Sequence, residues 1–157
     1  MDGTGAQAMD ELRGYCLEDL EVGMSAVYTK TVTDADLVLF AGVSGDINPM
    51  HVDQEYAKTT MLEGRIAHGM LTASFISAVL GTKLPGPGCI YLNQTLKFKA
   101  PVRPGDTVKA KVTIKAIDPE RARVTVDTVC TVAGKPVIEG EAVLMVPRRS
   151  AAVCAAE

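Results

Sequence analysis

The stretch that decides the fold is Gly69–Lys83, GMLTASFISAVLGTK, in which no residue before the final lysine carries a charge. Its length and its small and apolar side chains predict one helix, which the sequence LPGPG at Leu84–Gly88 brings to an end. A helix without a charged face is typically buried on all sides. In a chain of 157 residues, such burial predicts a sheet that wraps around the helix.

Segments with strand patterns supply that sheet. Val27–Val32 is rich in β-branched residues, and later segments alternate apolar and polar residues as half-buried antiparallel strands do. These later segments are Ile90–Ala100, Asp106–Ile117, Arg121–Val132 and Pro136–Val146. The predicted fold class is therefore α+β: a single domain in which an antiparallel sheet of about five strands wraps around one long buried helix. Long unpaired sheet edges promote aggregation, so we also expect a homodimer that pairs two such edges.

Length, charge and cysteine usage limit the classes of protein to which the chain can belong. The 157 residues fit one domain, for which we expect the bounds 16–147, with flexible tails at 1–15 and 148–157. A net charge of −3 argues against nucleic acid as a partner, since surfaces that bind it are basic. The first residues lack a signal-peptide pattern, and no apolar run is long enough to span a membrane. The cysteines are scattered without metal-binding spacing, which predicts free thiols in the cytoplasm and no metal site: Cys16, Cys89, Cys130 and Cys154.

Two short helices are expected before the long one. Thr33 and Asp36 fit a capping box that starts the first helix, and Asp53–Thr59 has the pattern of the second. Between them lies the sequence SGDINPMH at Ser44–His51, where glycines and a proline interrupt helix formation. We expect this octapeptide to form a rigid, non-helical segment.

The octapeptide carries the first candidate site residues, Asp46 and His51. A carboxylate and an imidazole on one rigid segment can exchange protons near neutral pH, and Asn48 between them can orient either group or a water. The same composition is also typical of an ordinary turn, because Asp and Asn side chains bond to their own backbone. Taken alone, the octapeptide fits that turn better than an active site.

The start of the long helix is the second candidate. The segment Ile66–Leu71, IAHGML, offers no Ser, Thr, Asp or Asn at the capping position, so the first N–H groups of the helix need another partner. Gly69 permits close approach, and the helix dipole adds partial positive charge. Such a terminus suits a carbonyl oxygen that becomes an oxyanion, although a simple tight turn at the glycine explains the sequence equally well.

Three longer stretches together resemble a known family. They are FAGVSGDINPMHVDQEYA at Phe40–Ala57, HGMLTASFISAVLG at His68–Gly81 and IYLNQTLKFKAPVRPGD at Ile90–Asp106. They are similar to the MaoC-like dehydratases of the hot-dog fold, and in particular to the R-specific enoyl-CoA hydratases. The resemblance covers roughly Leu17–Val146. It agrees with a sheet curled round one long helix.

The resemblance implies syn addition of water to a trans-2-enoyl-CoA, which gives the (R)-3-hydroxyacyl-CoA, and the reverse dehydration. Asp46 and His51 match the catalytic pair that holds one water, and which of the two is the base toward water stays open. Asn48 matches the asparagine of the motif, and the Gly69 N–H matches the oxyanion donor. No cofactor and no metal are implied, because coenzyme A is part of the substrate.

The resemblance also implies residues that bind the substrate. Ser77 matches a serine of the acyl pocket, and His68 is assigned to substrate binding. Other residues have an ordinary structural explanation as well, either as core side chains or as a solvated strand face. The candidates for pocket depth are Phe75, Ile76 and Leu80, and those for the coenzyme A phosphates are Lys97, Lys99 and Arg103.

Three other functions fit parts of the pattern. A hot-dog thioesterase would use a carboxylate to drive water onto the thioester carbon, which leaves His51 without a role. A non-catalytic acyl-CoA-binding subunit would not need Asp46, His51 and Gly69 together. A dehydratase of a branched or carboxylated 3-hydroxyacyl-CoA, such as a methylmalyl-type substrate, would use the same residues. Acyl chain length and pathway are not encoded in these motifs.

Overall fold

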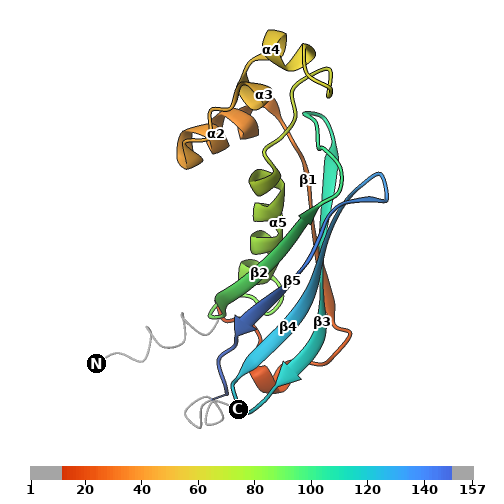
Figure 1. The fold of residues 1–157 in the computed structure, drawn as a ribbon. Coiled ribbons are helices and arrows are strands. Elements are labelled where there is room, and N and C mark those ends of the chain that lie inside the picture. The colour runs from red at the N-terminus through yellow and green to blue at the C-terminus, as the bar shows by residue number, and fades with distance from the viewer. Residues whose placement is uncertain (1–11, 150–157) are drawn as a thin grey trace, which may run out of the picture.

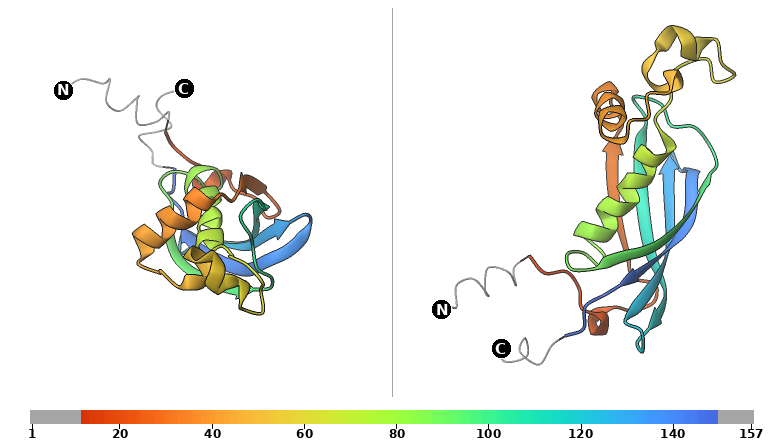
Figure 2. Two further views of the ribbon diagram at one scale, coloured as in Figure 1. Left: turned by 90° about the horizontal axis from the view of Figure 1, so that it is seen from above. Right: turned by 60° about the vertical axis from the view of Figure 1, so that its left-hand side comes forward.

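The long helix α5, Gly69–Thr82, lies along the concave face of one curled sheet in the computed structural model, which describes residues 12–149 (Figures 1 and 2). The helix packs against β1, β3 and β4, and these contacts form the hydrophobic core. Ile76, Val79 and Leu80 are fully buried there. The predicted hot-dog architecture, one sheet wrapped around one long helix, is confirmed.

The sheet is antiparallel throughout, with the strand order β1-β3-β4-β5-β2. The strands are β1, Ser25–Thr31; β2, Ile90–Phe98; β3, Thr107–Asp118; β4, Arg123–Val132; and β5, Lys135–Met145. All five predicted strands are present, with ends that differ by up to two residues from the sequence expectation. Within the described chain β1 and β2 are the two edges, and β2 exposes several large apolar side chains.

One expectation for α5 is wrong for the single chain, because the helix is not buried on all sides. The sheet covers one face, whereas a stripe along the other face is exposed to solvent, at Met70, Ser74, Ser77 and Gly81. These residues are mostly small and uncharged, so hydropathy alone does not separate the two faces of the helix. The exposed stripe lies beside the edge strand β2, across the second cavity described below.

The other α-helices gather at one end of the sheet, beyond the N-terminus of α5 (Figure 1). They are α2, Asp34–Ser44; α3, Pro49–Val52; and α4, Gln54–Lys58; a short 3₁₀ helix, η1, spans Leu17–Asp19. The predicted capping box is confirmed: the Asp36 N–H donates to Thr33 Oγ1, and the Thr33 N–H donates to Asp36 Oδ2. Helix α2 ends at Gly45, whose φ of 77° lies in the left-handed region that glycine adopts readily.

The segment Ser44–His51 is only partly non-helical, which corrects the sequence expectation. Pro49 occupies the first position of α3, where its missing N–H costs nothing, so His51 lies on a short helix. Asp46 stays in the extended connection before that helix. The proline therefore starts a helix here and does not merely end one.

The bounds of the packed domain lie close to those expected. Residues 1–11 and 150–157 of the predicted tails lie outside the described residues. Just before Cys16, however, the Gly14 and Tyr15 N–H groups donate to the carbonyls of Pro87 and Pro85. At the other end, the Arg149 N–H donates to Glu18. The chain is therefore tied down on both sides of the predicted 16–147 core.

The described cysteines form no disulfide: Cys16, Cys89 and Cys130 are free, and Cys154 lies outside the described residues. Burial raises the pKa of the Cys130 thiol to about 12 and also raises the pKa of Cys89. Both thiols therefore stay protonated near neutral pH and are poor nucleophiles. Within residues 12–149, no helix is long and apolar enough to cross a membrane.

We expect substitution of Gly140 on β5 to lower the stability of the protein sharply. A Cβ at this position would lie 1.8 Å from the carbonyl oxygen of Thr95 on β2, so Gly140→Ala forces the two strands apart. We expect the free energy of unfolding to fall by about 3 kcal/mol or more, measured by urea denaturation. Gly42→Ala is the matched control, because a Cβ there meets no atom within 4 Å on α2 and alanine favours the helix. Equal stability of the two variants would contradict this prediction.

Candidate active site

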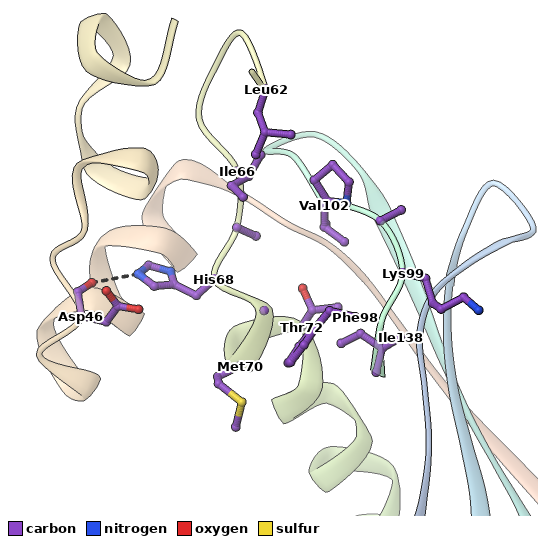
Figure 3. A pocket seen from close by; sticks show the side chains of 14 residues that line it. Asp46, Leu62, Ile66, His68, Met70, Thr72, Phe98, Lys99, Val102 and Ile138 are labelled. Carbon is purple, nitrogen blue, oxygen red and sulfur yellow. Dashed lines mark hydrogen bonds between the residues drawn. The ribbon is translucent and has the colours of Figure 1, made fainter. Parts of the chain in front are cut away.

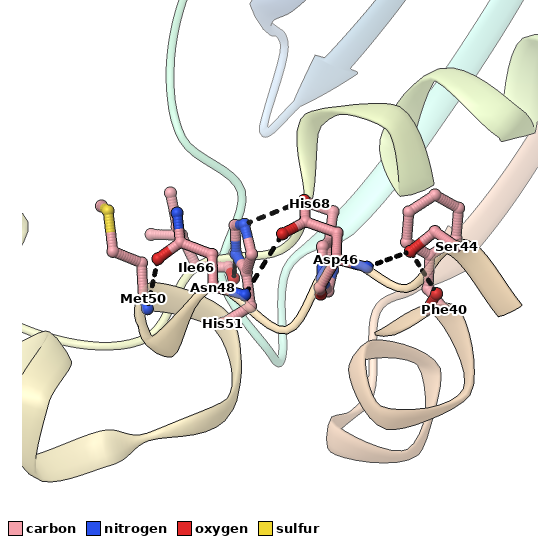
Figure 4. A network of polar contacts seen from close by, with 8 residues as sticks. All are labelled: Phe40, Ser44, Asp46, Asn48, Met50, His51, Ile66 and His68. Carbon is pink, nitrogen blue, oxygen red and sulfur yellow. Dashed lines mark hydrogen bonds and ion pairs between the residues drawn. The ribbon is translucent and has the colours of Figure 1, made fainter. Parts of the chain in front are cut away.

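Asp46 lies where α2 ends and before α3 begins, in a backbone bend held by local hydrogen bonds (Figure 4). The Asp46 N–H donates to Ser44 Oγ at 3.2 Å, and the Asn48 N–H donates to Asp46 Oδ1 at 3.2 Å. Its side chain is 52% exposed, so one carboxylate oxygen is held while the other, Oδ2, faces His51. The carboxylate therefore has a fixed direction without being sealed from solvent.

His51 is buried, and its hydrogen bonding fixes which nitrogen carries the proton. Its Nδ1 lies 2.8 Å from the carbonyl oxygen of Ile66, which can only accept, so Nδ1 is the donor. In the neutral ring, Nε2 therefore presents a lone pair. It lies 4.0 Å from Asp46 Oδ2, which is too far for a direct hydrogen bond. A water oxygen at about 2.8 Å from both atoms fits this separation.

Asn48 works through the backbone. Its side-chain oxygen accepts the Met50 N–H at 3.1 Å and so caps α3, while its carbonyl accepts the His51 N–H at 2.9 Å. These bonds set where α3 starts and so help to place His51, whereas the predicted role toward a water stays a prediction. The side-chain oxygen points to a backbone group and not to the imidazole (Figure 4).

His68 joins several parts of the site. Its Nε2–H donates to the carbonyl oxygen of Asp46 at 2.9 Å, again because a carbonyl only accepts. Its ring stacks on that of His51, with centroids 3.8 Å apart and an interplanar angle of 32°. Phe40 of α2 packs against it with a centroid distance of 5.0 Å. These contacts suggest a positioning role in addition to the substrate binding expected from the sequence.

Gly69 follows His68 at the first position of α5. No side chain caps this helix, as the sequence indicated, so its first N–H groups remain available to a ligand. A Cβ at Gly69 would lie 2.7 Å from the ring of Phe98, so a glycine is needed for this ring to pack over the helix start. The structure brings Asp46 and His51 together with His68 and Gly69, although α4 and the loop after it separate the two segments in the chain.

A cavity of about 550 Å³, called cavity 1, opens between this helix start and the loop that follows β2 (Figure 3). Asp46, His68, Gly69 and Thr72 line it on one side. Apolar side chains make up most of the rest: Leu62, Ile66, Ala67, Met70, Phe98, Pro101, Val102 and Ile138. Such a cavity is suited to a largely apolar ligand with a few polar groups.

The predicted phosphate-binding residues are not clustered. Lys99 lines cavity 1 and forms an ion pair with Glu139 at 3.3 Å. Lys97 is exposed on β2 opposite Glu139 and does not line the cavity. Arg103 donates to the carbonyl of Leu62 at the far side. Of the three, Lys99 is the cation placed at the cavity wall.

A second cavity of similar volume, cavity 2, runs between the exposed stripe of α5 and the edge strand β2. Ser77 lines it, as expected for an acyl-pocket residue, and Met70 lines both cavities. Phe75, Ile76 and Leu80 instead lie in the core and line neither cavity, so only their alternative role as core side chains has structural support.

Sequence reasoning missed other residues of the two cavities, among them Phe40, Thr72, Phe98 and Tyr91. The alternation of β2 offered one signal, because large apolar residues on an edge strand need cover. Burial raises the pKa of Tyr91 to about 12, so its hydroxyl stays protonated and donates to Gln94 in the wall of cavity 2. Tyr91 and Gln94 are therefore neutral polar groups in the wall of cavity 2.

Asp46, His51 and His68 also place one ligand atom each within 4.8 Å of one another, which is close enough for a metal ion. One nitrogen of each ring already bonds a carbonyl, which leaves one nitrogen of each imidazole and one Asp46 carboxylate oxygen in this cluster. The same groups can hold a water and move its protons.

Comparison with known proteins agrees with this geometry. The MaoC-like domain model matches residues 19–136. An (R)-specific enoyl-CoA hydratase of Rhodospirillum rubrum is 61% identical, over 89% of this chain and 97% of the relative. A 3-hydroxybutyryl-CoA dehydratase of Methylorubrum extorquens is 46% identical, over 92% of each chain. The unliganded R-hydratase PhaJ1 from Pseudomonas aeruginosa superposes with a TM-score of 0.82 at 47% identity, covering 87% of this chain and 88% of that structure. This chain therefore belongs to the MaoC-like domain family.

Proposed function

We propose that this protein is a hydro-lyase that adds water reversibly to trans-2-enoyl-CoA and forms (R)-3-hydroxyacyl-CoA. The observation that carries the proposal is the 4.0 Å gap between His51 Nε2 and Asp46 Oδ2, which fits one water beside the free N–H of Gly69. The names of its relatives, an (R)-specific enoyl-CoA hydratase and a 3-hydroxybutyryl-CoA dehydratase, describe the two directions of this reaction.

The geometry assigns a step to each group. The Gly69 N–H binds the thioester carbonyl oxygen, and the dipole of α5 stabilises the negative charge that develops there. This draws electron density from C3, where the water oxygen forms its new bond. His51 Nε2 accepts one proton of that water, since its lone pair is free, while Asp46 Oδ2 holds the other.

The same proton then completes the addition. His51 Nε2–H returns it to C2 as the enolate collapses, so one O–H bond and the C2=C3 π bond break while C3–O and C2–H bonds form. Donor and attacking oxygen lie on one side of the substrate, because both depend on the same imidazole nitrogen. Syn addition follows, and dehydration runs through these steps in reverse.

Hydration of crotonyl-CoA tests the reaction. The absorbance of the enoyl thioester should fall without release of free thiol, which a thioesterase would produce. We expect Asp46→Asn and His51→Ala each to lower kcat by at least about 100-fold, because each removes a partner of the reacting water. Asp127→Asn on β4 is the matched control, since this carboxylate pairs with Lys115 on the outer sheet surface. Thiol release at the rate of enoyl loss would overturn the proposal.

His68 holds the backbone carbonyl of Asp46, so its removal should lower turnover. His68→Phe keeps a ring between His51 and Phe40 but removes the donor to the Asp46 carbonyl. We expect kcat to fall by about 10-fold, as for the loss of one buried hydrogen bond. Circular dichroism checks that the fold is retained. An unchanged kcat would show that Asp46 needs no such anchor.

Cavity 2 is the best candidate for the acyl chain. It continues from Met70, which it shares with cavity 1, and follows α5 past Ser77. The residues that line it carry no charge: Phe40, Met70, Ala73, Ser74, Ser77, Tyr91, Leu92, Asn93, Gln94 and Leu96. A carboxylated acyl group would need a cation there. An uncharged acyl chain is therefore favoured over a methylmalyl-type substrate.

A homodimer through β2 would cover the apolar surface that the single chain leaves open. Ile90, Leu92 and Phe98 on this edge are each about half exposed, beside the uncovered stripe of α5. Pairing two β2 edges satisfies their backbone groups and buries these side chains. The free thiols of the described cysteines agree with a reducing, cytoplasmic location.

Light scattering coupled to size-exclusion chromatography tests the dimer. The wild-type chain should show twice the monomer mass, and Leu92→Lys should shift it toward the monomer, because the pairing edge would carry two buried charges. Met61→Lys is the matched control, since Met61 is also exposed and apolar but lies away from β2. A monomeric wild-type chain, or a Leu92→Lys dimer as stable as wild type, would contradict edge pairing.

A further inference from the structure

Two buried polar atoms without partners lie in the wall of cavity 1. Among residues 12–149, the buried side-chain nitrogen and oxygen atoms that lack a hydrogen bond are Nδ1 of His68 and Oγ1 of Thr72. Both side chains are 1% exposed, and both line cavity 1 (Figure 3). They are four residues apart at the start of α5, which places them on one face of the helix.

The hydrogen-bonding capacity of these two atoms defines the ligand group that could bond to both. His68 Nε2 already donates to the Asp46 carbonyl, so Nδ1 of the neutral ring can only accept a hydrogen bond. The Thr72 hydroxyl can donate. Residues 12–149 offer this hydroxyl no hydrogen-bond partner. The pair therefore matches a ligand group with one N–H or O–H donor and one acceptor.

The surroundings narrow the choice between a hydroxyl and an amide. Gly69, the oxyanion donor, lies next to His68 in the chain, so the subsite adjoins the thioester. The cavity wall also includes the apolar residues Ile66, Phe98 and Ile138 and the cation Lys99. Cavity 1 thus combines apolar walls, one polar pair and a cation. The pantetheine arm of coenzyme A carries groups that match them: two methylenes and an amide follow the sulfur, and phosphates lie farther on.

We propose that His68 Nδ1 and Thr72 Oγ1 bind the pantetheine amide nearest the sulfur. The amide N–H donates to His68 Nδ1, and the Thr72 hydroxyl donates to the amide carbonyl. This inference rests on the proposed function, because it assumes an enoyl thioester whose carbonyl is bound at Gly69. Occupation of the subsite by a water alone is the competing outcome, and substrate truncation distinguishes the two.

Two small thioesters test the contribution of this amide independently of the rest of the substrate. Crotonyl-N-acetylcysteamine carries this amide, whereas S-ethyl thiocrotonate ends before it, and both present the same reacting carbons. We expect Thr72→Val, which has nearly the same shape, to lower kcat/KM for the first thioester by about 5- to 20-fold, as for one lost hydrogen bond to a buried group. The value for S-ethyl thiocrotonate should stay within about twofold. Thr72→Ser should restore the wild-type ratio.

Thr128→Val is the matched control, because Thr128 is also a buried threonine but its hydroxyl bonds Gln94 and lies outside cavity 1. Its ratio between the two thioesters should equal that of the wild type. An equal loss on both thioesters in Thr72→Val, or no loss on either, overturns the amide assignment and leaves a water in the subsite. Failure of the wild-type protein to hydrate crotonyl-CoA would instead reject the proposed function, so the two failures are distinguishable.

Discussion

The hydrogen bond from His68 Nε2 to the carbonyl of Asp46 is the contact on which the site depends. It ties the connection between α2 and α3 to the residue that precedes α5, and so fixes the proposed acid–base pair relative to the Gly69 N–H. Without such an anchor, the partly exposed Asp46 would sample other positions relative to the start of α5. The bond is buried at the His68 end, where competition from solvent is weak.

Hydrogen bonds to backbone carbonyls also determine how the two imidazoles can act. Ile66 holds the proton of His51 on Nδ1, and Asp46 holds the proton of His68 on Nε2. The neutral rings therefore keep one lone pair at His51 Nε2 and another at His68 Nδ1, and of the two rings that of His68 lines cavity 1. One faces Asp46, while the other has no protein partner. The first is placed to exchange a proton, and the second to receive a donor from a ligand.

Much of the fold follows from local patterns in the sequence. The uncharged run of α5, the alternation of the later strands and the Thr33–Asp36 capping box each predict their element, because each depends on neighbours within a few residues. A motif and an uncapped helix start also point to Asp46, His51 and Gly69 as site candidates, which the structure places near one another. Sequence patterns fail where contacts between distant segments decide which way a side chain faces. Whether Phe75 or Ser77 faces a cavity depends on where β2 lies, and small uncharged residues fit either face of α5.

The role of Asn48 illustrates the same limit, since its side chain suits both a catalytic contact and a helix cap, and only the placement of α3 shows the cap. Thr72 gave no signal in sequence, because a threonine within an apolar helix is ordinary until its hydroxyl is found without a partner. Residues that act through backbone geometry or through an unmet hydrogen bond are therefore the ones that motifs leave out.

Phe98 connects the chemistry to the edge of the sheet. It is the last residue of β2, and its ring covers Gly69 so closely that no side chain fits beneath it. The strand that borders solvent in the single chain thus also covers the proposed oxyanion donor. Any displacement of β2, whether by a neighbouring chain or by a ligand in cavity 2, would move that cover. Under the proposed function, assembly state and acyl length would then both affect how tightly the thioester carbonyl is enclosed.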